Sequence, residues 1–174
     1  MQNQIKVMAV FSLIVLLLAG CSLEFDLVDA DPDTSQQIPD VDGAEMGRVV
    51  NVVDGDTIGV EINGAEERIR YVGVNTPERD EACYREATEA NAALVEGQIV
   101  TLVPDESDTD RFGRLLRYVY VGDTFVNREL VEDGYAEAVL YEPDDRHYEM
   151  FLQLERQAAA NGLGCHPTGI FDDN

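Results

Sequence analysis

Apolar residues follow a strand-like pattern over residues 47–72. A valine-rich run at 49–53 ends at an Asp-Gly turn signal, and the apolar residues of 58–62 then alternate with other residues. A second turn signal, Asn63-Gly64, precedes the segment Arg68-Ile69-Arg70-Tyr71-Val72. Strands joined by such tight turns predict a three-stranded antiparallel meander.

The pattern changes to a helical period after the meander. Ala87, Ala90 and Leu94 are spaced as on one helix face, which predicts a helix over 84–96. The remaining elements that we expect are strands at 98–103 and 115–121, a short helix at 124–133 and a longer helix at 144–161. This order predicts an α+β fold that is mainly β, a five-stranded OB-fold barrel with three helices over residues 45–174.

The amino-terminal residues have the pattern of a signal peptide. A nearly continuous apolar run at 7–20 follows Lys6, and it is shorter than the roughly 20 residues that cross a bilayer. It ends in Leu-Ala-Gly-Cys, which resembles the lipobox of prokaryotic lipoproteins. We therefore expect residues 1–20 to be removed, Cys21 to be lipidated, and the secreted protein to be anchored to the outer face of the cytoplasmic membrane. An uncleaved short anchor is the alternative.

The charge of the chain is strongly acidic, with 35 Asp and Glu against 12 Lys and Arg and a formal net charge of −23. The Asp-rich segment 21–44 is expected to be a disordered tether. The acidic run at 105–110 lacks the pattern of an EF-hand, so we expect it to be a solvated loop. Every basic residue except Lys6 is an arginine. This composition suggests adaptation to concentrated salt, where the Debye length is about 3 Å at 1 M, and it argues against a basic DNA-coating or membrane-surface protein.

The cysteine count favours one disulfide bond. If Cys21 carries lipid, Cys83 and Cys165 remain as a pair in an oxidising compartment. We expect them to form a disulfide that closes a loop of about 80 residues, for which chain entropy predicts about 4 kcal/mol of stabilisation. Two free buried thiols are the alternative.

Three short segments carry polar residues suited to phosphate chemistry. They are Asp54-Gly55-Asp56-Thr57, the segment 70–78, and Asp110-Arg111-Phe112-Gly113-Arg114. Each alone is a weak signal, because Asp-Gly pairs are common in hairpin turns. Together, in this order, they resemble the staphylococcal nuclease (thermonuclease) family from about residue 47 to about residue 161.

This resemblance implies the site of a calcium-dependent phosphodiesterase. The implied Ca²⁺ ligands are Asp56, Asn75 and the backbone carbonyl of Thr76. The implied catalytic residues are Arg70, Glu78 and Arg114, and substrate would be bound by the same two arginines together with Phe112 and Tyr141.

These residue types suit phosphodiester hydrolysis. Negative charge builds up on the phosphate oxygens in the transition state, and two arginines offset it with charge-assisted hydrogen bonds. A hard cation held by oxygen ligands adds positive charge, and Glu78 would accept a proton from the attacking water. Asn75 departs from the family, which has Asp there, so we expect weaker Ca²⁺ binding.

The strand register raises one question about this site. If Asn63-Gly64 is a two-residue turn, Asp56 faces Tyr71, and Arg70 points to the other side of the sheet. Either a bulge near Gly59 restores a common side, or Asp56 lies beyond the ladder in the turn.

The sequence thus predicts a monomeric, secreted nuclease that hydrolyses DNA, RNA or both with low sequence specificity and, following the family, leaves 3′-phosphate ends. A non-catalytic OB module that holds single strands is one alternative, although the chain has no Trp for base stacking. A calcium-stabilised surface or adhesion domain is another. Such a domain would keep its metal when Arg70 is replaced and would turn over no substrate.

Overall fold

The computed structural model of the protein describes residues 43–172. Its strands are β1 (Glu45–Val52), β2 (Thr57–Ile62), β3 (Ala65–Tyr71), β4 (Val74–Asn75), β5 (Ile99–Val103), β6 (Leu115–Val121), β7 (Thr124–Phe125) and β8 (Glu137–Ala138). Its helices are α1 (Tyr84–Val95), α2 (Val126–Glu132) and α3 (Tyr148–Asn161), followed by a 3₁₀ turn, η1 (His166–Thr168). The expected signal peptide, Cys21 and all but the end of the expected tether lie outside the described residues.

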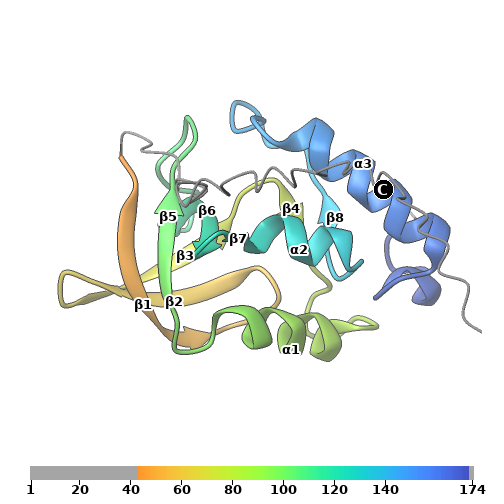
Figure 1. Ribbon diagram of the computed structural model, residues 1–174, viewed down its shortest axis with the longest axis horizontal. Coiled ribbons are helices and arrows are strands. Elements are labelled where there is room, and N and C mark those ends of the chain that lie inside the picture. The colour runs from red at the N-terminus through yellow and green to blue at the C-terminus, as the bar shows by residue number, and fades with distance from the viewer. Residues whose placement is uncertain (1–42, 173–174) are drawn as a thin grey trace, which may run out of the picture. The chain divides into compact units, whose positions relative to one another are not determined.

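The five longer strands close into a barrel. Neighbouring strands are hydrogen-bonded in the order β3-β2-β1-β5-β6, and a parallel pairing of β3 with β6 completes the ring. In Figure 1, β1, β2, β3 and β5 are gathered at the left, and α2 and α3 lie at the right. This closure confirms the predicted five-stranded OB-fold barrel with three helices.

Aliphatic side chains fill the barrel. Ile58, Val60, Ile69, Leu102 and Val119 have no exposed surface. Helix α2 contacts β6 and both of the other helices. Burial on this scale supports the ends of β2 and β3 firmly, because close-packed interiors resist displacement of the strands that line them.

The register of β2 and β3 answers the question raised by the sequence. Thr57 pairs with Arg70 in an uninterrupted ladder, and the only bulge that this part of the meander shows is in β1, between Val49 and Asn51. Asp56 immediately precedes β2, and its carbonyl accepts a hydrogen bond from Tyr71 N at 2.9 Å. The second alternative is therefore correct: Asp56 lies beyond the ladder, in the turn before β2.

The longer carboxy-terminal helix begins later than predicted. It starts at Tyr148 rather than at residue 144, because side chains hold the preceding backbone in another conformation. Asp144 accepts a hydrogen bond from Ser107 N at 2.6 Å, and Asp105 accepts one from Arg146 N at 3.3 Å. The expected short helix also loses its first two residues, which form β7 instead.

The acidic segment 105–110 is a loop in which Glu106 and Asp108 are exposed, as the sequence suggested, but two of its carboxylates also pair with arginines. The Asp105 side chain is only 4% exposed and pairs with Arg146 at 2.9 Å. Asp108 pairs with Arg117 at 2.7 Å, in contact with a guanidinium that is itself 5% exposed. The segment therefore pairs with two arginines, and for the buried Arg117 this pairing offsets the cost of burying its charge.

Cys83 and Cys165 form a disulfide with a Cα–Cα distance of 5.6 Å, as predicted. It joins the start of α1 to the carboxy-terminal segment, where Phe171 packs with Ala87 and Cys165. Within residues 43–172, no helix is long and apolar enough to cross a membrane.

Candidate active site

The turn before β2 presents a buried carboxylate. Asp56 is 6% exposed, and its Oδ2 accepts hydrogen bonds from Thr76 N at 2.9 Å and Thr76 Oγ1 at 3.0 Å. The turn itself is held by Asp54, whose Oδ1 accepts a hydrogen bond from Asp56 N at 3.1 Å. A side chain at Gly55 would place its Cβ 2.7 Å from Thr76 Oγ1, so glycine is required for this close approach.

Arg70 lies at the end of β3 and meets Asp56 directly. Its Nε is 3.2 Å from Asp56 Oδ1. Its Nη1 donates to the carbonyls of Tyr71 at 2.6 Å and Val74 at 2.8 Å, and its Nη2 donates to Asn75 Oδ1 at 3.1 Å. Hydrogen bonds to described residues use three of the five guanidinium N–H hydrogens, and Nε forms an ion pair with Asp56, so the Arg70 side chain is tightly fixed.

Arg114 reaches the same site from the segment before β6. Its Nε donates to Asp110 Oδ2 at 2.7 Å, and its Nη1 donates to Thr57 Oγ1 at 3.4 Å. Burial raises the pKa of Asp110, but hydrogen bonds from Arg114 and Phe112 N–H outweigh this and keep that pKa below its usual value. Asp110 therefore stays ionised and holds Arg114 in place.

Thr57 connects the two arginines. Its hydroxyl donates to Asp56 Oδ1 at 3.1 Å while accepting from Arg114. Sequence reasoning assigned no role to Thr57, although it belongs to the Asp-Gly-Asp-Thr segment. Its place directly after Asp56 in that segment was the available indication.

Asn75 lies between Arg70 and a buried carboxylate on β8. Besides accepting from Arg70, it donates from Nδ2 to Glu137 Oε1 at 3.0 Å. Glu137 is 5% exposed. No motif pointed to it, because its contact with Asn75 depends on a β4–β8 pairing between residues 62 positions apart.

The predicted Ca²⁺ ligands, Asp56, Asn75 and the Thr76 carbonyl, are all oxygen donors of the kind that Ca²⁺ prefers. The side-chain oxygens of Asp56 and Asn75 accept contacts from Thr57, Thr76 and Arg70 in this structure. Burial, together with the nearby Asp56 charge, raises the pKa of Asp54, so a bound cation would relieve repulsion in this turn. No three or more His, Cys, Asp or Glu side chains cluster to hold a metal within residues 43–172, so water molecules would have to complete the coordination shell.

Glu78 is the predicted catalytic residue whose side chain these hydrogen bonds do not reach. It follows Thr76 and Pro77 on the segment after β4, and its side chain is exposed. Its backbone N–H donates to Glu81 Oε2 at 2.7 Å, which fixes the local chain direction. The structure thus joins Asp56, Arg70, Asn75, Thr76 and, through Thr57, Arg114 in one chain of hydrogen bonds and an ion pair. It leaves the Glu78 carboxylate accessible to solvent.

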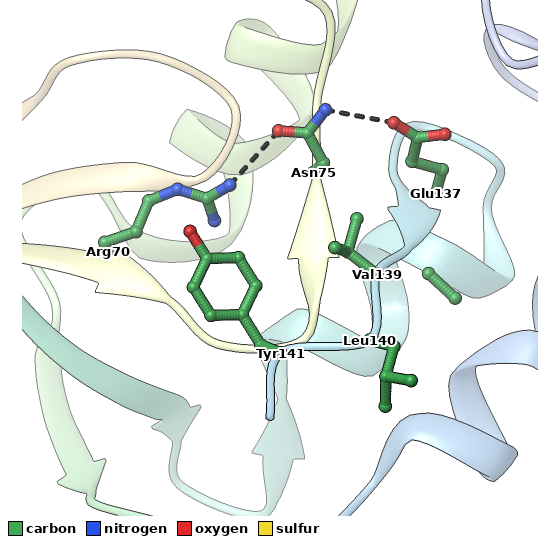
Figure 2. A pocket seen from close by; sticks show the side chains of 7 residues that line it. Arg70, Asn75, Glu137, Val139, Leu140 and Tyr141 are labelled. Carbon is green, nitrogen blue, oxygen red and sulfur yellow. Dashed lines mark hydrogen bonds between the residues drawn. The ribbon is translucent and has the colours of Figure 1, made fainter. Parts of the chain in front are cut away.

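A cavity of about 440 Å³ lies beside this chain, and Arg70, Asn75, Glu137 and Tyr141 are among the residues that line it. Figure 2 shows the Tyr141 ring in this cavity with its hydroxyl directed toward the Arg70 guanidinium. Tyr141 is 41% exposed and also lines a neighbouring cavity of about 400 Å³ with Phe112.

Phe112 is 70% exposed, and the Arg111 guanidinium carbon lies 4.7 Å from the centre of its ring. An exposed ring covered by a guanidinium, next to a second exposed aromatic residue, is a surface on which a nucleic-acid base can stack. The two predicted substrate-binding aromatic residues therefore share one hollow.

Comparison with known proteins gives a consistent result. The family model described as staphylococcal nuclease homologue matches residues 68–165. A thermonuclease of Staphylococcus intermedius is 32% identical over 156 residues, covering 86% of this chain and 92% of that protein. A second thermonuclease, of Staphylococcus hyicus, is 34% identical over 117 residues, covering 64% and 69%. Endonuclease YncB of Bacillus subtilis is 36% identical over 129 residues, covering 67% and 61%.

The family match includes Arg70, Glu78 and Arg114. The similarity to the first relative extends over most of both chains. The chain therefore belongs to the staphylococcal nuclease family.

Proposed function

We propose that the protein is a calcium-dependent nuclease that hydrolyses phosphodiester bonds of DNA, RNA or both outside the cell, with low sequence specificity and 3′-phosphate products. The observation that carries this proposal is the convergence of Arg70 and Arg114 on the Asp56–Thr57 dipeptide, beside a cavity lined by Tyr141. Arg70 lines this solvent-accessible hollow and Arg114 contacts the same dipeptide, so two positive charges are placed near the second negative charge that a phosphodiester develops in the transition state of hydrolysis.

The two arginines have different parts in substrate binding. Arg114 commits Nε and Nη1 to described residues, so its Nη2 remains for a phosphate oxygen. Arg70 makes three hydrogen bonds and, through Nε, an ion pair with Asp56, which leaves the second N–H of Nη2 for substrate. It therefore acts as a fixed point charge with one directed hydrogen bond. Preorganised donors of this kind stabilise charge that develops in the transition state, and losing one costs about 10²–10³ in turnover in other enzymes.

Glu78 supplies the proton acceptor. Its exposed carboxylate, on the segment that follows Thr76, would take a proton from the water that attacks the phosphorus. Asp56 and Thr76, with Asn75 beside them, would hold Ca²⁺, which when bound adds positive charge at the phosphate and orients the water.

The test is hydrolysis of plasmid and single-stranded DNA and of RNA by the purified chain, with Ca²⁺ or with EDTA. We expect cleavage with Ca²⁺, none with EDTA, and a loss of at least about 10²-fold in Glu78→Gln. Glu96→Gln, an exposed glutamate at the end of α1, is the matched control and should keep full activity. Sensitivity of the product ends to a 3′-phosphatase checks the cleavage position.

The outcomes separate the alternatives. Tight DNA binding without cleavage would favour a non-catalytic binding module. Calcium binding that persists in Arg70→Ala, with no cleavage by the unaltered chain, would favour a calcium-stabilised surface domain.

The protein's location is part of the same proposal. The Leu-Ala-Gly-Cys sequence at residues 18–21 supports lipidation of Cys21, and the Cys83–Cys165 disulfide fits an oxidising compartment outside the cytoplasm. In a bacterial host, the full chain should fractionate with membranes and be accessible to added protease. Cys21→Ala should abolish incorporation of labelled palmitate; unchanged labelling would refute lipidation at this residue.

A further inference from the structure

The small β4–β8 sheet places a buried carboxylate behind Arg70. Asn75 and Glu137 are directly opposite each other in its antiparallel register. The Asn75 amide lies between two charged groups, with Oδ1 3.1 Å from Arg70 Nη2 and Nδ2 3.0 Å from Glu137 Oε1 (Figure 2). A continuous path of hydrogen bonds thus joins Glu137 to Arg70.

The charges at both ends determine the orientation of the amide. A guanidinium only donates hydrogen bonds and an ionised carboxylate only accepts them. The Asn75 oxygen must therefore face Arg70 and its NH₂ must face Glu137, because a flipped amide would lose both contacts. An aspartate at this position would still accept from Arg70, but its second oxygen would oppose the Glu137 carboxylate in a partly buried site, where like charges repel.

We infer that Asn75 and Glu137 are a matched pair that positions Arg70, with Glu137 acting through the Asn75 amide. One of the two N–H groups of Arg70 Nη2 makes no contact with a described residue. Asn75 occupies the other hydrogen of Nη2, and it thereby fixes the direction in which the remaining N–H points. The inference rests on the proposed nuclease function, in which Arg70 binds the phosphate.

Exchange of the amide and the carboxylate between the two positions tests the pairing. The proteins compared are the unaltered full chain, Asn75→Asp, Glu137→Gln and the double variant, each assayed on a single-stranded oligonucleotide at saturating Ca²⁺. Asn75→Asp should lower kcat about tenfold with KM within about threefold, because transition-state contacts are lost rather than ground-state binding. Glu137→Gln should cost less than about threefold, because the Gln oxygen still accepts from Asn75.

The double variant is decisive. Its carboxylate at position 75 would accept both from Arg70 and from the new amide at position 137, so kcat should return to within about threefold of the unaltered chain, a non-additive result expected only for directly coupled residues. Full turnover in Asn75→Asp, or a double variant no better than Asn75→Asp, would overturn the inference. Thermal unfolding of all four proteins provides the control, since a purely structural role would make the loss of kcat follow the loss of Tm.

A second measurement does not depend on turnover. The side-chain ¹⁵N–H resonances of Arg70 should shift and exchange faster with solvent in Asn75→Asp and return toward their original positions in the double variant. Unchanged Arg70 resonances in Asn75→Asp would refute the pairing even in an inactive protein. Lack of nucleic-acid cleavage by the unaltered chain would instead refute the proposed function.

Discussion

Thr57 Oγ1 lies 3.4 Å from Arg114 Nη1 and accepts its hydrogen bond, although the two residues are 57 positions apart. The same hydroxyl donates to Asp56 Oδ1. Because Arg70 Nε contacts that same carboxylate oxygen at 3.2 Å, one buried threonine links the two arginines of the site. The spacing of these two charges, which we propose to bind phosphate, therefore depends on the first residue of β2.

Replacing Thr57 by Val should weaken catalysis more than folding. Valine has nearly the same shape, and Thr57 has no exposed surface, but the change removes a hydrogen bond to each neighbour. We expect kcat/KM to fall about tenfold, the order found for residues coupled within one network. Thr57→Ser keeps the hydroxyl and should retain activity within about threefold. Equal losses in the two variants, measured by steady-state kinetics, would indicate a packing role instead.

Replacing Asn75 by Asp should tighten Ca²⁺ binding while it slows turnover. The added carboxylate contributes a full negative charge next to Asp56, and Ca²⁺ affinity rises with the charge of its ligands. Titration calorimetry with Ca²⁺ alone measures this without substrate. An unchanged affinity would show that Asn75 does not belong to the metal site, and it would leave positioning of Arg70 as the role of this residue.

Much of the barrel could be predicted because its strands are local in sequence. The meander is joined by tight turns, and the observed pairing of Ile58 with Ile69 follows from the Asn63-Gly64 turn alone. The disulfide partners followed from cysteine number and compartment. These features depend on short-range patterns and on composition.

The contacts that tune the site could not be predicted, because they join distant segments with little periodicity. Strands β4 and β8 have two residues each, which is too short for an alternating pattern to be recognised. Their pairing nonetheless places Glu137 against Asn75. The helix expected to begin at residue 144 starts later because Asp144 bonds to Ser107 N across the fold, a tertiary contact that overrides local propensity.

Removing the disulfide should destabilise the domain through its carboxy-terminal segment. Cys83 and Cys165 are 82 positions apart, and chain entropy for such a loop predicts a loss of up to about 4 kcal/mol in the free energy of unfolding. Chemical denaturation of Cys83→Ser/Cys165→Ser should show a lower midpoint than the oxidised protein. Reduction of the unaltered chain should give the same midpoint as the double variant, and a midpoint insensitive to both changes would contradict this account.

Nuclease activity should pass through a maximum at a raised salt concentration. The chain carries a formal charge of −23, so at low ionic strength it repels a polyanionic substrate and association is slow. Added salt screens this repulsion, but at higher concentrations it also weakens the contacts of Arg70 and Arg114 with phosphate. Initial rates on one oligonucleotide at saturating Ca²⁺, measured across a NaCl series, should therefore rise and then fall.

Two glutamates distant from the site provide the control for this salt dependence. Glu61 and Glu66 are both exposed and face each other across β2 and β3, near the hairpin end of the meander. Glu61→Gln/Glu66→Gln removes two negative charges without touching either arginine. The rate at low salt should increase and the maximum should move to lower NaCl, because less repulsion remains to be screened. A rate that falls steadily from the lowest salt in both proteins would show that the surface charge does not limit association.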